Sequence, residues 1–339
     1  MADLSCDIVV IGAGVLGLSV AAELTARRHD VRVVDPGGPN ASSVAAGMIA
    51  PAFESLLDGA DAERAALLRD ASALWPAFAA RSGLLLDRTS AEWRGSDAGE
   101  VAGALSRLGF RVKAEGDVVR AESDIRIDAE AALERLRVGL GERFVVAEAR
   151  SAKRTPEGWR VGTTAGPIDA RQLIVATGVA ATLPGLPDVV AGVIDAIEPI
   201  AGQIGRTGAR LTDRVVRGVG GYVAPAAAGS LIGATMVHGS RETAPDPAAS
   251  ARLVEVATRL SGASAPDVEW RGGVRGATPD GLPLAGPVGD GLHLALAPRR
   301  NGWLLGPLVA RVVADGIEGR PRGSHAAALD PLRFGPQSF

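Results

Sequence analysis

Three glycines near the N-terminus have the spacing of a loop that binds phosphate groups. Residues 12–17 read Gly-Ala-Gly-Val-Leu-Gly and match the pattern G-x-G-x-x-G. In this pattern Gly12 permits a tight turn, Gly14 lets the backbone approach a pyrophosphate, and Gly17 lets a helix pack close to a strand. The N–H groups at the start of that helix then face the phosphates. The motif alone is weak evidence, because glycines of this spacing also serve only for packing.

An acidic residue follows the motif where a dinucleotide site requires one. Asp35 ends the apolar run 31–35 and lies 18 residues after Gly17, the last glycine of the motif. A carboxylate at this position accepts hydrogen bonds from ribose hydroxyls and disfavours a 2′-phosphate. The glycines at 218, 220 and 221 are not spaced to form a second fingerprint. The sequence therefore predicts one dinucleotide site, and this motif alone leaves both FAD and NAD open.

No other group of residues indicates acid–base, nucleophilic or metal chemistry. The sequence has neither a Ser-His-Asp arrangement nor paired carboxylates. Its four histidines are scattered at positions 29, 238, 293 and 325, so no metal site is expected. Cys6 is the only cysteine, which rules out an internal disulfide and fits a cytoplasmic location.

The elements that must position these residues alternate between strands and helices. A β-branched run over 7–11 predicts a buried strand, the Ala/Leu-rich stretch 15–28 a helix, and 31–35 the next strand. Further helices are predicted over 61–80 (interrupted at Pro76), 126–140, 247–261 and 303–316. Further strands are predicted over 143–149, 159–163, 172–176, 193–201, 221–225 and 230–236.

The composition is that of a globular protein without a polyanionic partner. The chain has 339 residues, of which 47% are hydrophobic, and a formal net charge of −3. Because nucleic-acid-binding surfaces need basic stripes, no nucleic-acid partner is expected. The apolar run 8–24 is broken by glycine and serine and has no basic flank, so we expect neither a secretory signal nor a transmembrane segment.

The segment after the glycine motif resembles a known family. Residues 41–51 read Ala-Ser-Ser-Val-Ala-Ala-Gly-Met-Ile-Ala-Pro and resemble the corresponding loop of the D-amino-acid oxidase superfamily, especially of its glycine oxidases. In that family the loop follows the ribityl–pyrophosphate chain of FAD, and its Ala-Gly-Met backbone passes the flavin ring. Four further stretches are similar to the family in the same order, so the resemblance covers nearly the whole chain: 174–178, 221–236, 273–283 and 300–307.

The resemblance implies FAD as the cofactor. We expect the FAD to be non-covalent, because covalent attachment needs a Cys or His beside the ring, and no histidine falls between residues 30 and 237. The implied cofactor-binding residues are Gly12, Gly14, Val15, Leu16, Gly17, Asp35, Pro36, Ala41, Ser42, Ser43, Ala46, Gly47, Met48, Ala149, Ala176, Thr177, Gly178, Pro298, Arg299, Arg300, Asn301, Gly302, Trp303 and Leu304.

The resemblance also implies four residues on the substrate side. Arg275 would hold the substrate carboxylate as a bidentate partner, and Tyr222 would donate its hydroxyl to the same group. Met236 would line the pocket, and Arg300 would lie beside the flavin and the substrate. The alternatives are a structural salt bridge for Arg275, a surface hydroxyl for Tyr222 and a solvated pair of Arg300 with Arg299.

Three stretches depart from the glycine oxidase pattern. Residues 297–299 read Ala-Pro-Arg where those enzymes typically have Gly-His-Phe or Gly-His-Tyr. Gly220 replaces a histidine two positions before the family tyrosine, and residues 84–122 match no family segment. Because all three lie on or near the substrate side, the resemblance supports flavin binding better than it supports a particular substrate.

We therefore expect an α/β fold with a Rossmann-like FAD-binding domain of the glutathione-reductase type. This domain would comprise residues 1–80, 123–187 and 272–339, and an interleaved antiparallel-sheet substrate domain would comprise 81–122 and 188–271.

The implied activity is oxidation of the C–N bond of a small amino acid, such as glycine, sarcosine or a small D-amino acid. Hydride would pass to flavin N5, and O2 would take the electrons to give an imino acid and H2O2. The alternatives are a dehydrogenase of the same fold with a quinone or other acceptor, and a flavin-binding protein without turnover. The substrate side chain and a homo-oligomeric state stay open.

Overall fold

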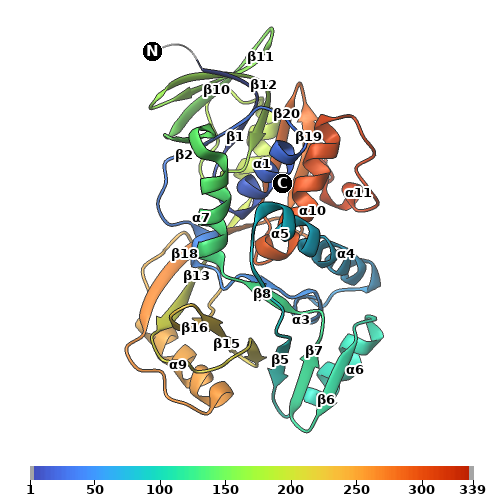
Figure 1. Cartoon of the computed structure of the whole chain (residues 1–339), viewed down its shortest axis with the longest axis vertical. Coiled ribbons are helices and arrows are strands. Elements are labelled where there is room, and N and C mark those ends of the chain that lie inside the picture. The colour runs from blue at the N-terminus through green and yellow to red at the C-terminus, as the bar shows by residue number, and fades with distance from the viewer. Residues whose placement is uncertain (1–3, 336–339) are drawn as a thin grey trace. The chain divides into compact units, whose positions relative to one another are not determined.

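The computed structural model describes residues 4–335, and the chain divides into two compact units (Figure 1). Unit 1 consists of Met1–Asn40, Leu133–Pro199 and Arg275–Phe339, and unit 2 of Ala41–Ala132 and Ile200–Val274. The expected division instead grouped 41–80, 123–132 and 272–274 with the nucleotide-binding segments and 188–199 with the substrate segments. The compact units therefore differ from the expected boundaries, and the functional division stays a prediction.

Unit 1 is built on a mixed eight-stranded sheet with β1 (Leu4–Ile11) in its centre. β1 pairs in parallel with β2 (Val31–Asp35) on one side and β12 (Gly166–Val175) on the other. The last four residues of β1 are buried, as a central parallel strand requires. The remaining strands are β9 (Phe144–Val146) beside β2, and β10 (Ala149–Thr155), β11 (Gly158–Thr163), β19 (Leu284–Gly289) and β20 (Leu292–Leu296) beyond β12.

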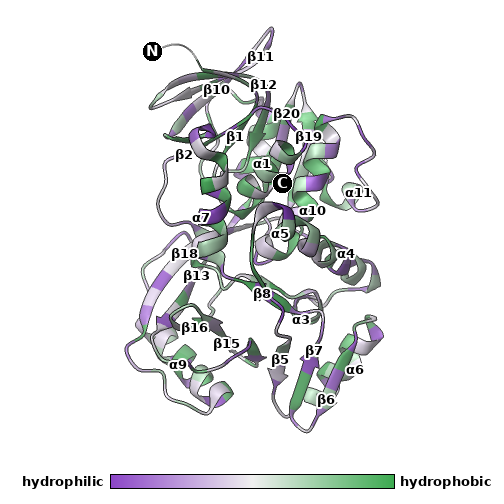
Figure 2. Cartoon of the chain, viewed as in Figure 1, coloured by the Kyte–Doolittle hydropathy of each residue, from purple (hydrophilic) through white to green (hydrophobic). Residues whose placement is uncertain are grey.

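Two helices of unit 1 pack closely together beside this sheet. α1 (Val15–Ala26) contacts α10 (Gly302–Ile317), most of which is buried and apolar (Figure 2). The contact is close because a Cβ atom at Gly306 would lie 2.9 Å from Ser19 Oγ. The other helical segments are α7 (Ala129–Leu140), which begins in unit 2, η1 (Gly141–Arg143), α8 (Asp188–Asp195) and α11 (Ala326–Leu329).

Unit 2 contains a nine-stranded sheet and a small three-stranded one. The large sheet has the order β17-β13-β16-β15-β14-β5-β7-β6, with β18 also paired to β13, and the small one has the order β3-β8-β4. The strands are β3 (Met48–Ile49), β4 (Leu86–Asp87), β5 (Ala91–Arg94), β6 (Val112–Glu115), β7 (Val118–Ala121), β8 (Ile125–Ile127), β13 (Glu198–Thr207), β14 (Val216–Gly218), β15 (Gly221–Ala226), β16 (Gly229–Gly233), β17 (Val237–His238) and β18 (Glu269–Ala277). The helices are α2 (Ala41–Val44), α3 (Pro51–Leu57), α4 (Ala62–Ala73), α5 (Trp75–Ser82), α6 (Ala98–Arg107) and α9 (Pro247–Ser261).

Most of the predicted elements are present, and the exceptions have local causes. The predicted helix 61–80 is two helices that meet at Leu74, one residue before the Trp-Pro start of α5. The predicted strand 193–201 is correct only from Glu198, where β13 begins, and wrong before it, because α8 extends to Asp195. The predicted helix over 126–140 starts at Ala129, after β8, and the predicted strand over 230–236 ends at Gly233.

No helix among residues 4–335 is long and apolar enough to span a membrane.

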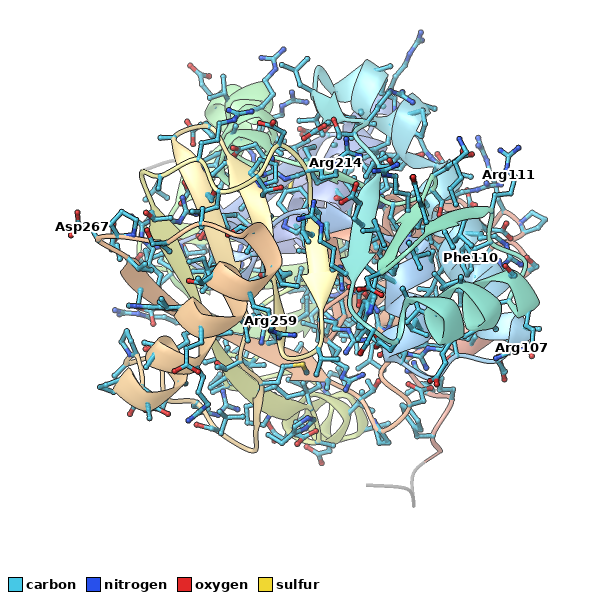
Figure 3. All side chains as sticks on the ribbon, turned by 90° about the horizontal axis from the view of Figure 1, so that it is seen from below. Arg107, Phe110, Arg111, Arg214, Arg259 and Asp267 are labelled. Atoms are coloured by element: carbon cyan, nitrogen blue, oxygen red, sulfur yellow. The ribbon has the colours of Figure 1, made fainter. Side chains whose placement is uncertain are left out.

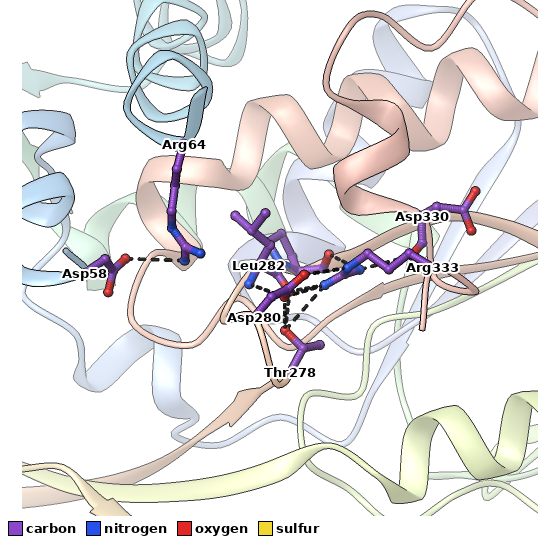
Figure 4. A network of polar contacts seen from close by, with 8 residues as sticks. Asp58, Arg64, Thr278, Asp280, Leu282, Asp330 and Arg333 are labelled. Atoms are coloured by element: carbon purple, nitrogen blue, oxygen red, sulfur yellow. Dashed lines mark hydrogen bonds and ion pairs between the residues drawn. The ribbon is translucent and has the colours of Figure 1, made fainter. Parts of the chain in front are cut away.

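A bidentate ion pair fastens the C-terminal segment of unit 1 (Figure 4). Arg333 Nε donates to Asp280 Oδ2 at 2.9 Å, and Arg333 Nη2 donates to Asp280 Oδ1 at 2.8 Å. Burial acts to raise the pKa of Asp280, but Arg333 and the Leu282 N–H outweigh it, so this pKa is below the ordinary value. The stabilisation is therefore present above the unfolded pKa and is lost as the pH falls through the folded pKa.

Replacing Arg333 by methionine tests this contact. The expected loss at neutral pH is about 1–2 kcal/mol of unfolding free energy, because solvent screens the partly exposed Asp280. Urea unfolding at several pH values measures it. The difference between wild type and Arg333→Met should shrink as the pH falls towards 3–4, roughly the carboxyl range. A difference that stays constant there would show that Arg333 acts through packing alone.

Candidate cofactor and substrate site

The turn between β1 and α1 has no room for side chains at two of its glycines. Gly12 has φ +107°, and a Cβ atom there would lie 2.3 Å from the Ala176 carbonyl oxygen. A Cβ atom at Gly17 would lie 2.0 Å from the Gly12 carbonyl oxygen. Gly14 is the N-cap of α1 and has no side chain that could cap the helix or shield its N-terminus. This arrangement fits the pyrophosphate of a dinucleotide.

Asp35 is fixed beside this turn at the end of β2. Its Oδ2 accepts a hydrogen bond from the Ala13 N–H at 2.7 Å, and its Oδ1 accepts one from the Gly37 N–H at 2.7 Å. Each carboxylate oxygen keeps a lone pair for a further donor. The placement is that expected for the residue that binds ribose hydroxyls, and neighbouring Pro36 is exposed.

Substitution of Asp35 by alanine should therefore weaken FAD binding. The lost charge-assisted hydrogen bonds are worth roughly 1.5–3 kcal/mol, which is a factor of ten or more in the dissociation constant. Titration of the apoprotein with FAD measures this change, and the substrate preference should stay the same. If the dissociation constant does not change, Asp35 holds only the protein turn.

Two further segments of unit 1 lie at the glycine turn. Ala176 follows β12 and donates its N–H to the Ile11 carbonyl at 2.8 Å, so Ala176 and Thr177 lie beside Gly12, and Gly178 follows with φ +68°. A Cβ atom at Gly302 would lie 3.0 Å from Val15 Cγ1, which places the start of α10 against the first turn of α1. The adjacent Leu16 is buried. Ala149, by contrast, lies at an irregularity at the start of β10 and is half-buried.

The turn before α10 has unusual backbone conformations. Ala297 has φ +56° and Arg299 has φ +51°, both in the region that favours glycine. Such conformations cost roughly 1–3 kcal/mol each and are concentrated at functional sites. The Arg299 N–H donates to the Gly276 carbonyl at 2.8 Å, so this turn lies beside the strand end that carries Arg275. In unit 1, the backbone at Arg275 therefore lies close in space to the backbone at Arg299 and Arg300.

The buried members of this turn can offer only their backbone to a ligand. Asn301, Trp303 and Leu304 are at most 3% exposed, and Trp303 and Leu304 belong to the apolar core. Arg275, Pro298, Arg299 and Arg300 are half-buried. We therefore expect the arginine side chains, and the N–H groups of the first turn of α10, to be the parts that meet a ligand.

The loop 41–48 begins unit 2 and is held by β8. Ala41, Ser42 and Ser43 lie in the short helix α2, and Ala46 is buried. Gly47 has φ +71°, and a Cβ atom there would lie 2.0 Å from the Ile127 carbonyl oxygen. The Ile127 N–H donates to the Gly47 carbonyl at 2.8 Å, and Met48 pairs with Arg126 across β3 and β8. The Ala-Gly-Met backbone is therefore firmly positioned; its contact with the flavin stays a prediction.

Tyr222 lies in a row of residues that crosses the large sheet of unit 2. Strand register places Trp93, Arg217, Tyr222, Gly233 and Ile204 side by side. Directly opposed residues share one face of a sheet. The Tyr222 ring lies over Gly233, where a Cβ atom would be 2.3 Å from the hydroxyl oxygen. Because Tyr222 is half-buried and packs on the apolar core, the alternative of a surface tyrosine is disfavoured.

Met236 lies just beyond β16, the strand beside Tyr222. It is half-buried and precedes β17, whose His238 is exposed. Met236 and Tyr222 therefore both belong to unit 2, and Arg275 and Arg300 belong to unit 1.

Sequence reasoning missed a buried polar cluster near Met48. Arg217 Nη2 lies 2.6 Å from Glu54 Oε1 and 2.6 Å from Met48 Sδ, and both charged side chains are less than 8% exposed. Asp124 is fully buried and accepts the N–H groups of Ala52 and Phe53 at 2.8 Å. Burial raises the pKa of Asp124 to about 6, against the opposing effect of those N–H groups and of Arg217. The only sequence signal was an arginine inside the apolar run 215–219.

The flavin should be released by acid, because Cys6, His29 and His293 are not available for covalent attachment to its ring. Cys6 is half-buried in β1, His293 is 3% exposed and bonded to Gln172, and His29 is paired with Glu318. Acid precipitation should therefore leave the yellow colour in the supernatant. Colour that stays in the pellet would refute non-covalent binding.

The sequence of the chain matches a known class of flavoenzyme. Residues 7–316 match the DAO family, described as FAD dependent oxidoreductase. The chain therefore belongs to this family. It is an FAD-dependent oxidoreductase with a mixed α/β fold, which confirms the predicted family, cofactor and fold class.

The chain is also similar to individual members of known function. The chain is 28% identical to the glycine oxidase of Geobacillus kaustophilus (strain HTA426), over 92% of this chain and 93% of that protein. It is also 28% identical to the tRNA 5-methylaminomethyl-2-thiouridine biosynthesis bifunctional protein MnmC of Caulobacter vibrioides, over 89% of this chain but only 53% of that longer protein. The crystal structure of glycine oxidase from Geobacillus kaustophilus is similar in fold, with a TM-score of 0.80 and 24% identity over 97% of this chain and 99% of that one.

Proposed function

We propose that the protein oxidises the C–N bond of a small amino acid. The observation that carries this proposal is the similarity to a glycine oxidase over nearly the full length of both chains. The placement of Arg275 and Tyr222 supports it. Arg275 is half-buried beside the left-handed turn 297–299, and Tyr222 lies half-buried across Gly233.

In the proposed reaction, each group of residues has a defined role. The glycine turn, Asp35 and the first turn of α10 hold the cofactor. Arg275 binds the substrate carboxylate through two parallel N–H groups, and Tyr222 donates its hydroxyl to the same carboxylate. Anchored in this way, the substrate keeps its Cα–H in a fixed orientation. FAD, when bound, accepts the hydride. No side chain has to act as a strong base if the substrate amine binds neutral.

Two alternatives differ from this proposal in the fate of the electrons and in the substrate. A dehydrogenase would pass the electrons to a quinone or another acceptor, and a protein without turnover would not accept them at all. The similarity to MnmC raises a further alternative, an amine carried on a nucleoside.

Peroxide release tests the oxidase proposal. The holoprotein is mixed with glycine, sarcosine, D-alanine and methylaminomethyluridine in air, and H2O2 and imine hydrolysis products are measured. We expect peroxide and product in equal amounts with one of the amino acids. Product formation only with an added quinone would favour the dehydrogenase, and turnover of the nucleoside alone would contradict an amino-acid substrate.

A further inference from the structure

Gly233 leaves open the space in which the ring of Tyr222 lies. The two residues are direct cross-strand partners on β16 and β15 of unit 2. A Cβ atom at Gly233 would lie 2.3 Å from both Cζ and the hydroxyl oxygen of Tyr222, and 2.8 Å from Cε1. Carbon atoms in contact are normally about 3.5–4.0 Å apart. The tip of the ring therefore occupies the place that a side chain at position 233 would need.

The residues on either side of this pair are fixed. In the row of cross-strand partners, Arg217 of β14 lies beyond Tyr222, and Ile204 of β13 lies beyond Gly233. Arg217 is 4% exposed and is held by Glu54 at 2.6 Å, and Ile204 is 2% exposed. Gly233 is the one member of the row without a side chain, and the ring lies over it.

Helix α9, which carries Arg259, covers the opposite face of these strands (Figure 3). Val223 and Ile232, the chain neighbours of Tyr222 and Gly233, pack with this helix in one apolar cluster. Because side chains alternate along a strand, Tyr222 and Gly233 face away from α9. Tyr222 packs instead against a second apolar cluster. The position of the ring is therefore determined on that other face of the sheet, where it lies over Gly233.

We propose that Gly233 is a positioning residue: it lets the Tyr222 ring lie across β16 and thereby sets where the phenol hydroxyl meets the substrate carboxylate. This inference rests on the proposed function and deepens it, because it names the residue on which the orientation of Tyr222 depends. Even alanine at position 233 would push the ring tip away by about 1 Å. A misplacement of about 1 Å in a binding group can lower a rate by about 100-fold.

The chain has one tyrosine, Tyr222, so a spectroscopic signal can report on this ring alone. Holoprotein made with fluorotyrosine is studied by fluorine NMR, with and without acetate as an unreactive carboxylate. We expect Gly233→Ala to move the tyrosine resonance even without acetate, because the Cβ atom displaces the ring. Acetate should shift the resonance of wild type and leave that of Gly233→Ala nearly unchanged.

Gly205→Ala is the matched control in the same sheet. Gly205 lies on β13, and a Cβ atom there would be 2.5 Å from Val268 Cγ1 and 2.9 Å from the ring of Trp270. Val268 and Trp270 pack with the cluster on the side of α9, so this variant disturbs the sheet away from Tyr222. Its tyrosine resonance and its response to acetate should equal those of wild type, even where its stability is lower.

A double-mutant cycle tests whether Gly233 acts through the hydroxyl of Tyr222. The dissociation constant of acetate is measured from the change in the flavin spectrum for wild type, Gly233→Ala, Tyr222→Phe and the double variant. We expect each single variant to bind acetate at least about tenfold more weakly. Once the hydroxyl is absent, Gly233→Ala should add no more than about a twofold loss. An equally large loss in the Tyr222→Phe background would contradict a role through the hydroxyl.

Folding of the variants is decided by the same geometry. The atoms that obstruct a Cβ atom at Gly233 belong to the end of a side chain, which can move, so Gly233→Ala should fold. If it does not, Gly233→Ala/Tyr222→Ala should fold, because the obstructing ring is then removed. Failure of that variant as well would show that Gly233 serves the backbone, and would overturn the inference.

The remaining outcomes separate this inference from the proposed function. An unchanged tyrosine resonance in Gly233→Ala overturns the positioning role, and amino-acid oxidation by the wild-type protein would then leave the proposed function intact. A wild-type resonance that acetate does not move contradicts the contact of Tyr222 with a carboxylate, and the inference fails with it. If no amino acid reduces the flavin but the response to acetate depends on Gly233, the proposed function fails and the positioning role stands.

Discussion

Replacing Arg275 by alanine is expected to keep the flavin spectrum and to lower kcat/KM for the amino-acid substrate by about two orders of magnitude, or about 3 kcal/mol. The reason is that arginine offers two parallel donors that fix both the distance and the plane of the substrate carboxylate. That plane determines whether the Cα–H points at the hydride acceptor, so both the reduction rate and the binding constant should suffer. Anaerobic stopped-flow reduction of the flavin separates these two effects.

Two further variants make the test of Arg275 specific. Arg275→Lys should recover only part of the activity, because an ammonium keeps the charge but lacks the two parallel N–H donors of the guanidinium. Arg271→Ala is the matched control: Arg271 lies four residues earlier on β18, is 43% exposed and pairs with Glu269 and Glu130. This variant should behave as wild type. If Arg275→Ala retains near wild-type efficiency, Arg300 becomes the candidate for the carboxylate anchor.

Replacing Gly17 by alanine should weaken FAD binding by at least about 100-fold, or about 2.7 kcal/mol. A Cβ atom at this position would lie 2.0 Å from the Gly12 carbonyl oxygen and 3.1 Å from Ala176 Cβ. Since the obstructing oxygen belongs to the backbone, the turn itself has to open, and the N–H groups of α1 move away from the pyrophosphate. Titration of the apoprotein with FAD gives the change directly.

Gly139→Ala is the control for this substitution. Gly139 lies in α7, and a Cβ atom there would meet nothing within 4 Å. Alanine in a helix is favoured over glycine by roughly 0.8–1.0 kcal/mol, so this variant should be slightly more stable and bind FAD normally. Normal FAD affinity in Gly17→Ala would mean that the cofactor does not depend on this turn.

The sequence predicts well those parts of the fold whose structure depends on residues that are adjacent in the sequence. The strand–turn–helix–strand unit at residues 4–35 follows from a β-branched run, the glycine spacing and a terminal aspartate. Helix α9 has the predicted bounds because Asp246 caps its first turn and Gly262 ends it in the left-handed conformation. By contrast, the apolar run 188–201 contains both a helix and a strand, and periodicity alone does not separate them.

The parts that the sequence could not predict depend on contacts between distant segments. Glu54 and Arg217 are 163 positions apart, and Asp124 accepts the Ala52 N–H from 72 positions away. The residues next to them in the sequence form no pattern that predicts a buried charge. The compact units likewise depend on which segments pack together, and so residues 41–80 grouped differently from expectation. By contrast, FAD is implied by the family resemblance alone, without knowledge of contacts between distant segments.

Anaerobic mixing of the holoprotein with amino acids tests the central claim most directly. The purified protein, freed of oxygen, is mixed with glycine, sarcosine, D-alanine, D-aspartate and D-glutamate while the visible absorbance of the flavin is followed. Amino-acid oxidation predicts that at least one of them bleaches the flavin, and that admitted air restores the colour with the release of peroxide. If dithionite bleaches the flavin and none of the amino acids does, the protein does not oxidise these amino acids and the proposed function is wrong.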